Sequence, residues 1–228
     1  MCIRDRLPTA QDHKRLNEKD RGPNTGGMGA YSPAPLLTGD YLDRIIKEII
    51  EPTINELNTR NIDYRGVIYF GLMITKSGPK VIEYNCRFGD PECQTIMPMM
   101  DQNFVFLLEK CAMGSLTGEE KINISDKVSG CVIATSKGYP HEYKNGYQIK
   151  IGKIDSNDCQ IFDSGTSFSE SGKLLTAGGR VLSIVCQDKD FDTVFEKAYK
   201  NLKEIHFEGI YFRNDIGHQV RKNFSKEN

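Results

Sequence analysis

The sequence of 228 residues lacks the features that mark several classes of protein. No apolar run approaches the roughly 20 residues that a membrane-spanning helix needs. The N-terminal segment MCIRDRLPTA has no apolar stretch of the kind found in secretory signals. The charge is nearly balanced, with 30 basic against 31 acidic residues, so the basic excess typical of nucleic-acid-binding proteins is missing. We therefore expect neither a membrane nor a nucleic acid as a partner.

Paired cysteine motifs are also missing. The seven cysteines are odd in number and form no CxxC pair, which argues against a disulfide framework and against a zinc site. Most lie among apolar neighbours, as in GCVIA and SIVCQ, where a free thiol packs as a small hydrophobic group. We expect the cysteines to be packing residues and the compartment to be the reducing cytoplasm.

The sequence does contain a mixture of helix and strand patterns. Apolar residues at helical spacing predict helices in residues 41–57, where Pro52 kinks or restarts the helix, and in residues 104–113. A third helix is expected in residues 192–206, with an apolar stripe formed by Val194, Ala198, Leu202 and Ile205.

Apolar, β-rich runs predict strands at 66–74 and 80–85, joined as a hairpin by the turn KSGPK, and at 129–135 and 179–187. The polar stretch TGEEKINISDK separates the two parts of this pattern. We place a domain boundary there, giving domains 1–122 and 123–228, the second small and β-rich.

The segment KVIEYNCRFGDPE carries the most specific chemical signal. Because side chains alternate along a strand, Glu83, Asn85 and Arg87 are expected on one face, with an apolar face opposite that can pack into a core. A carboxylate and an amide oxygen suit Mg²⁺, and a guanidinium suits a phosphate or carboxylate. Gly89 and Pro91 bend the chain after the strand. The alternative is that these are the polar residues of a half-exposed strand.

The segment GPNTGGMGAYSP is rich in glycine and follows a charged stretch. Glycine allows backbone N–H groups to approach an anion closely, so a phosphate-binding or lid loop is one interpretation. A flexible surface loop is the other, because the spacing matches neither common nucleotide-binding glycine motif.

Together these motifs resemble the glycinamide ribonucleotide synthetases, or phosphoribosylamine–glycine ligases, of the ATP-grasp superfamily. The string RFGDPE followed by x-Gln is the family's signature, and DHKR with KDRGPNTGGMGAYSP extends it. KGYP, FDSGT, GGRVL and RNDIG resemble the family's C-terminal domain. The resemblance begins at Leu7 and implies an α+β fold: the C-terminal half of an ATP-grasp domain, then a small β-rich domain.

The resemblance implies a ligase of purine biosynthesis that uses ATP, glycine and 5-phosphoribosylamine, with Mg²⁺ or Mn²⁺. It would form glycinamide ribonucleotide, ADP and phosphate through glycyl phosphate, as a monomer in the full-length family. It implies that Glu83 and Asn85 bind the metal. Arg87 would hold phosphate charge or a substrate carboxylate. Asp90 and Glu92 would orient Arg87 or substrate. The loop closing over glycine and the transferring phosphate would be Asn24, Thr25, Gly26, Gly27, Met28 and Gly29.

The sequence departs from the family pattern in two respects. Family members carry upstream domains that bind phosphoribosylamine and grip ATP, so we expect a truncated piece with an extraneous start, MCIRDR. Many ATP-grasp enzymes also place a further carboxylate where Phe70 and Gly71 stand here. A second metal ion would then need Asp12 and Asp20, or phosphate and water alone. Another ATP-grasp carboxylate–amine ligase, and an inactive nucleotide-binding fragment, remain the alternative functions.

Overall fold

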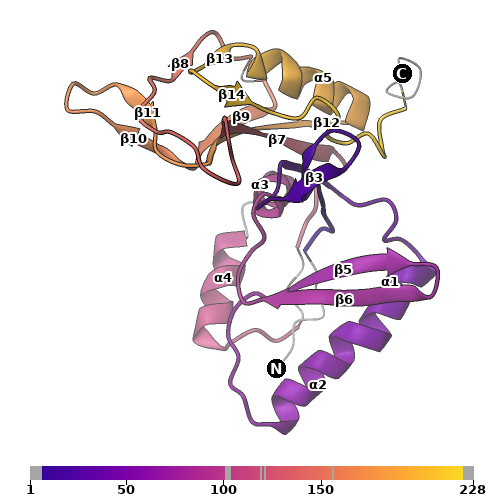
Figure 1. Cartoon of the computed structure of the whole chain (residues 1–228). Coiled ribbons are helices and arrows are strands. Elements are labelled where there is room, and N and C mark those ends of the chain that lie inside the picture. Colours follow the sequence, from indigo (N-terminus) through magenta and orange to yellow (C-terminus); the bar gives the residue numbers. More distant parts are fainter. Residues whose placement is uncertain (1–6, 101–103, 119, 121, 156, 223–228) are drawn as a thin grey trace. The chain divides into compact units, whose positions relative to one another are not determined.

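The computed structural model of the protein describes residues 7–100, 104–118, 120, 122–155 and 157–222 (Figure 1). The chain forms two compact units, each interrupted along the sequence. The hairpin–helix unit comprises the segment ending at Thr9, Ala34–Gly89 and Met100–Ile124. The sheet unit comprises Ala10–Pro33, Asp90–Met99 and the segment beginning at Ser125. Their mixture of helices and strands confirms the predicted α+β class.

The predicted division into 1–122 and 123–228 cuts the chain once, whereas the compact units alternate along it. One crossing between them, from Ile124 to Ser125, lies beside the predicted boundary. As an assignment of domains the division stays a prediction. The expected extraneous start, residues 1–6, lies outside the described residues.

The hairpin–helix unit contains one long helical stretch, which confirms the helix predicted around residues 41–57. It consists of α1 (Asp40–Ile45), a π-helical turn (Ile46–Ile50) and α2 (Glu51–Thr59). Pro52 lies in the first turn of α2, directly after the π-helical turn, and lacks the N–H with which an interior residue of a continuous helix bonds to the preceding turn. Regular helix therefore restarts at the proline after the π-helical turn.

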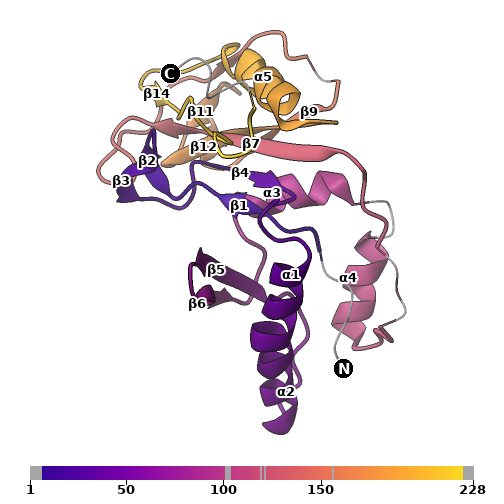
Figure 2. The same cartoon turned by 90° about the vertical axis from the view of Figure 1, so that its right-hand side faces the viewer.

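The same unit contains α4 (Phe104–Met113) and a hairpin of β5 (Tyr69–Thr75) and β6 (Gly78–Asn85), visible in both Figure 1 and Figure 2. These elements confirm the predicted helix and hairpin. The expectation that the apolar face of β6 packs into a core is wrong, because Ile82 is 63% exposed and Tyr84 50% exposed. Two strands alone offer little apolar cover, and the register shifts between Gly71 and Leu72.

The sheet unit is built on an antiparallel sheet with the order β1-β4-β7-β12-β9, in which β14 also pairs with β7. Among the described residues, three short strand pairs of this unit lie outside that sheet. The strands of the sheet are β1 (Gln11–Asp12), β4 (Gly29–Ser32), β7 (Val128–Ser136), β9 (Cys159–Asp163), β12 (Arg180–Asp188) and β14 (Ile210–Tyr211). The short paired strands outside it are β2 (Arg15–Asn17) with β3 (Arg21–Asn24), β8 (Lys150–Ile151) with β13 (Ile205–His206), and β10 (Thr166–Phe168) with β11 (Leu174–Thr176). The strands predicted at 129–135 and 179–187 are thus confirmed as β7 and β12.

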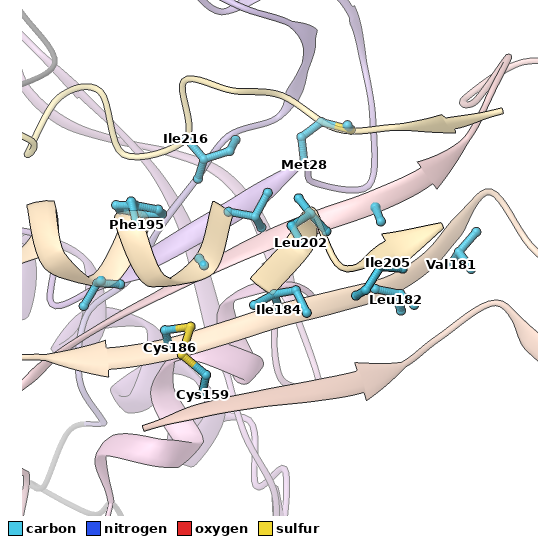
Figure 3. Packing of buried hydrophobic residues seen from close by; sticks show 14 of the residues in the cluster. Met28, Cys159, Val181, Leu182, Ile184, Cys186, Phe195, Leu202, Ile205 and Ile216 are labelled. Carbon is cyan, nitrogen blue, oxygen red and sulfur yellow. A yellow bond between two sulfur atoms is a disulfide. The ribbon is translucent and has the colours of Figure 1, made fainter. Parts of the chain in front are cut away.

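The core of this unit lies between the sheet and α5 (Phe191–Leu202). Val194, Phe195, Ala198 and Leu202 are completely buried, and they share one cluster with residues of β7 and β12. Figure 3 shows Phe195 and Leu202 on the helix, with Leu182 and Ile184 on the strand. Ile205 belongs to the same cluster but lies in β13, so the predicted helix ends earlier than expected.

A shorter helix, α3 (Glu92–Ile96), continues into a 3-10 turn (Met97–Met99) and packs against β4 and β7. It starts directly after the Asp90–Pro91 turn.

In the described part of the chain no helix is both long and apolar enough to cross a membrane.

One cysteine pair contradicts the sequence prediction. Cys159 and Cys186 stand directly opposite each other on β9 and β12 and are joined by a disulfide (Figure 3). The expectation that every cysteine is a free packing residue is wrong for this pair, because sheet register, invisible in the sequence, brings the two together. Cys131 is free and fully buried, as expected of a packing thiol.

We predict that Asp190→Ala lowers the free energy of unfolding by about 1 kcal/mol, because Asp190 caps α5. Its Oδ1 accepts a hydrogen bond from the N–H of Thr193 at 2.9 Å. Denaturant unfolding would measure the change, and Asp190→Ser, which retains a capping oxygen, is the control. Equal losses in both variants would contradict the capping role.

Candidate functional site

Glu83 and Asn85, the predicted metal ligands, are neighbours on one face of β6. Asn85 Nδ2 donates a hydrogen bond to Glu83 Oε1 at 3.1 Å, as expected for side chains two positions apart on a strand. The amide oxygen and the second carboxylate oxygen remain as hard oxygen donors of the kind that Mg²⁺ prefers. Among the described residues no group of three or more histidines, cysteines, aspartates and glutamates is suited to hold a metal. With one carboxylate and one amide, the pair itself suits a cation that takes few ligands from protein.

Gly71 stands directly across the hairpin from Glu83. A Cβ added at Gly71 would lie 2.8 Å from Glu83 Cγ, so a longer side chain there would force Glu83 to move. The position where many ATP-grasp enzymes place another carboxylate is thus used here to make room for Glu83.

Arg87 lies beyond the end of β6, which stops at Asn85. Its side chain is exposed, and its Nη1 donates a hydrogen bond to the carbonyl oxygen of Phe88 at 2.7 Å. The strand alternation that places Glu83 and Asn85 on one face therefore does not extend to Arg87. Its role at the site stays a prediction.

Asp90 and Glu92 belong to the sheet unit. Asp90 Oδ2 accepts a hydrogen bond from Arg180 Nη2 at 2.9 Å, and its Oδ1 accepts one from Gln94 Nε2 at 2.8 Å. Glu92 is the first residue of α3 and only 2% exposed. The turn between them thus directs one carboxylate to an arginine and the other into the interior.

The glycine-rich loop connects β3, which ends at Asn24, to β4, which begins at Gly29. Four consecutive N–H groups of this loop donate to acceptors within the chain. Their acceptors are the Lys14 carbonyl for Thr25 at 2.7 Å, the Tyr139 hydroxyl for Gly26 at 2.7 Å, Thr25 Oγ1 for Gly27 at 3.0 Å and the His13 carbonyl for Met28 at 2.9 Å. The loop is therefore held in place by its own amides, which an anion-binding loop would leave available.

Gly27 shows why this loop needs glycine. Its φ of +118° disfavours any side chain, and a Cβ there would collide with Pro91 and lie 2.8 Å from Asp12 Oδ1. The loop thus packs directly on the Asp90–Pro91 turn and above a buried carboxylate.

Asp12 is a feature that sequence reasoning missed, having considered it only as a second metal ligand. Burial raises the pKa of Asp12 to about 7, and the nearby Glu92 carboxylate acts in the same direction. Lys14 forms an ion pair with Asp12 at 2.8 Å and opposes the shift, but water screens this half-exposed lysine. Asp20, the other candidate, pairs with Arg213 at 2.9 Å. Both aspartates are therefore engaged by basic side chains.

Arg180 and Tyr139 were also missed as site residues. They lie in the motifs GGRVL and KGYP, which marked only the family resemblance, and both bond to Gly26. No local pattern connects them to a loop more than a hundred residues earlier; only the folded chain does.

We predict that Asp12→Asn raises the free energy of unfolding at pH 8 by about 2 kcal/mol, because it removes a buried charge. Because the pKa of Asp12 is raised in the folded state, its contribution to stability is fully present below 3.8, the pKa in the unfolded chain. That contribution is lost as the pH rises to about 7, the pKa in the folded state. The gain should therefore vanish below about pH 4. Thermal unfolding across pH would measure it, with Asp163→Asn on the exposed end of β9 as control. A less stable Asp12→Asn at pH 8 would show that Lys14 keeps Asp12 favourably charged.

Curated proteins similar to this chain are phosphoribosylamine–glycine ligases. Those of Synechocystis sp. and Caldanaerobacter subterraneus are 43% and 45% identical to it over 94% and 92% of its length. The chain spans about half the length of these relatives, 51% and 50%. The human trifunctional purine biosynthetic protein adenosine-3 is 40% identical over 92% of the chain, which covers 21% of that protein.

Solved structures show the same relationship. The crystal structure of the phosphoribosylamine–glycine ligase of Thermotoga maritima matches 92% of this chain, which covers 51% of that protein, with a TM-score of 0.81 at 33% identity. A biotin carboxylase of Campylobacter jejuni matches 94% of this chain, which covers 46% of that protein, with a TM-score of 0.60 at 15% identity. The second match shows a shared fold alone.

Two profiles of one protein family account for most of the sequence. The ATP-grasp (A) domain of phosphoribosylglycinamide synthetase matches residues 4–93, which contain the glycine-rich loop, Glu83, Asn85 and the turn that follows. The C domain of the same synthetase matches residues 129–219, which contain Tyr139 and Arg180. The chain therefore belongs to the phosphoribosylglycinamide synthetase family and carries the latter part of its ATP-grasp fold.

Proposed function

We propose that this chain is the C-terminal part of a phosphoribosylamine–glycine ligase of purine biosynthesis. The observation that carries the proposal is the pair Glu83 and Asn85, hydrogen-bonded on one strand face and followed, after Cys86, by RFGDPE. Relatives of that name over more than nine tenths of the chain support it. Its substrates would be ATP, glycine and 5-phosphoribosylamine.

The proposed reaction has two steps. A glycine carboxylate oxygen attacks the γ-phosphorus of ATP, which forms glycyl phosphate and releases ADP. The amine nitrogen of phosphoribosylamine then attacks the acyl carbon, phosphate leaves, and the nitrogen loses a proton to give the amide. Phosphoryl transfer of this kind depends mainly on positioning and on neutralising charge, so the chain needs no nucleophilic side chain.

Glu83 and Asn85 would hold Mg²⁺ or Mn²⁺, because their oxygens provide the hard donors that such ions take. A bound divalent ion would neutralise charge on the ATP phosphates. Arg87, with its exposed guanidinium, would contact phosphate oxygens or the glycine carboxylate, for which its planar fork is suited.

Asp90, Glu92 and the glycine-rich loop, all within the sheet unit, would contribute to binding glycine. Since the amides of Thr25, Gly26, Gly27 and Met28 are occupied within the chain, we expect the loop to act through its fixed position rather than by donating N–H groups to phosphate. Asp90 would orient substrate from a carboxylate that Arg180 and Gln94 hold in place.

A cytoplasmic location and a monomeric state complete the proposal. Disulfides are rare in the cytosol, so the proposed location implies that Cys159 and Cys186, which are joined in this structure, are reduced there. Alkylation of the purified chain before and after reduction would show whether this bond forms in the cell.

The test is ADP release in the longest translated chain that contains these 228 residues. Release that requires both glycine and phosphoribosylamine supports the ligase. Release with a different carboxylate or amine would indicate another ATP-grasp carboxylate–amine ligase. Failure to release ADP, with retained nucleotide binding, would indicate an inactive nucleotide-binding fragment.

Glu83→Gln should abolish glycine-dependent ADP formation, by at least about a hundredfold, because it removes the charged oxygen donor for the metal. Its melting temperature should stay unchanged, since Glu83 lies exposed on the hairpin. Mn²⁺ binding in the presence of ADP gives a second readout, and Glu109→Gln on the exposed side of α4 is the matched control. Near-normal turnover in Glu83→Gln would rule out the metal role.

A further inference from the structure

Arg180, at the start of β12, joins two segments of the sheet unit that are distant in sequence. Its Nη1 donates hydrogen bonds to the carbonyl oxygens of Gly26 and Asp90, each at 2.9 Å, and its Nη2 donates to Asp90 Oδ2 at 2.9 Å. One guanidinium therefore holds the glycine-rich loop and the Asp90–Pro91 turn at a fixed separation.

Tyr139 binds the same loop residue, Gly26, through the backbone N–H of that glycine. The Tyr139 hydroxyl accepts a hydrogen bond from the Gly26 N–H at 2.7 Å, while Arg180 takes the Gly26 carbonyl. A Cβ added at Gly26 would lie 3.0 Å from Arg180 Cζ and 3.1 Å from the Tyr139 hydroxyl. Gly26 thus fits closely between two side chains of the C-terminal region.

These contacts contribute more to geometry than to stability. The Arg180 side chain is 21% exposed and that of Asp90 is 46% exposed, so solvent weakens the ion pair. Three acceptors on one planar group nevertheless fix both distance and orientation, which a lysine ammonium cannot do. A contact with this balance suits the positioning of a site better than the support of a fold.

The β2–β3 strand pair that leads into the loop is held in place by residues other than Arg180. Arg213, which is completely buried, binds both oxygens of Asp215 and also reaches Asp20 in the turn between β2 and β3. The strands that lead into the loop are therefore anchored without Arg180. Its loss should free the loop tip and Asp90 while leaving the sheet intact.

We propose that Arg180, assisted by Tyr139, is a positioning residue for the ligase reaction. It holds Asp90 and the glycine-rich loop in the arrangement that binds glycine, although it does not itself touch substrate. This inference rests on the proposed function, because it takes the loop and Asp90 to contribute to binding glycine. It gives residues of the C-terminal region an indirect role in substrate binding.

The first experiment compares Arg180→Lys, Tyr139→Phe and wild type by steady-state kinetics in the longest translated chain. We expect the KM for glycine to rise about tenfold or more in Arg180→Lys, equivalent to about 1.4 kcal/mol. Tyr139→Phe should give a smaller rise, because it removes one hydrogen bond. The KM for ATP should stay within about twofold of the wild-type value. Loss of a purely structural residue would instead lower the active fraction, without raising the KM for glycine relative to the KM for ATP.

The second experiment needs no activity. Hydrogen–deuterium exchange of residues 22–30 in the 228-residue chain should be faster in both variants than in wild type, with unchanged exchange in α5. Guanidinium added to Arg180→Ala, in which the exchange should also be faster, should slow that exchange again. Arg60→Lys, which alters an exposed ion pair with Glu56 on α2, is the matched control and should change neither measurement.

Either measurement can overturn the inference. We call the contacts of Arg180 and Tyr139 with Gly26 and Asp90 the clamp. An unchanged KM for glycine in an active Arg180→Lys enzyme would show that the clamp is not used for substrate binding. Unchanged exchange in residues 22–30 would show that Arg180 does not hold the loop at all. If wild type releases no ADP in response to glycine, the proposed function fails and the substrate role with it, while the exchange result still decides whether the clamp exists.

Discussion

Strand β7 is the element on which the sheet unit depends, because it pairs with three other strands and is buried almost throughout. β4 and β14 pair with successive parts of it, while β12 runs along it in an antiparallel register. Val132 and Ala134 belong to the core beneath α5, and Cys131 and Ile133 form a second cluster with Val185. A strand buried on both faces needs apolar residues at consecutive positions, which β7 supplies.

This strand also determines where the glycine-rich loop lies. Because β4 pairs with β7 from Gly29 onward, the C-terminal end of the loop is fixed to the centre of the sheet. The opposite end is held through Thr25, whose N–H and hydroxyl both donate to the Lys14 carbonyl. The loop is thus a short rigid connection between strands, and the side chains that contact Gly26 act on a segment that the sheet has already placed. Sites supported in this way keep their geometry with little freedom to drift.

The sequence predicts local helices and strands here far better than it predicts contacts between residues that are distant along the chain. Apolar patterns predict α4, α5, the β5–β6 hairpin and the strands β7 and β12, because each pattern lies within the sequence of that one element. In α5, β7 and β12 the pattern also reflects burial, whereas in β6 much of the apolar face is exposed. Such patterns fail where burial depends on distant residues: β1 and β4 join the sheet from a polar, glycine-rich segment, and Ile205 leaves the helix for β13. For the site, adjacent positions on β6 predict that Glu83 and Asn85 meet. Nothing local predicts that Arg180 reaches Gly26 and Asp90, or that Asp12 is buried near Glu92.

The two groups of polar residues differ in what the fold requires of them. Glu83 is exposed on a hairpin whose apolar face is itself exposed, so its carboxylate costs the fold little. Asp12 and Glu92 are buried, so each carboxylate must lose its hydration. Well-packed apolar or amide side chains would fill the same space at lower cost. Proteins depart from the rules of burial mainly at functional sites. Burial of the Asp12 and Glu92 carboxylates is therefore consistent with the proposed role of the glycine-rich loop and the Asp90–Pro91 turn, a role that stays a prediction.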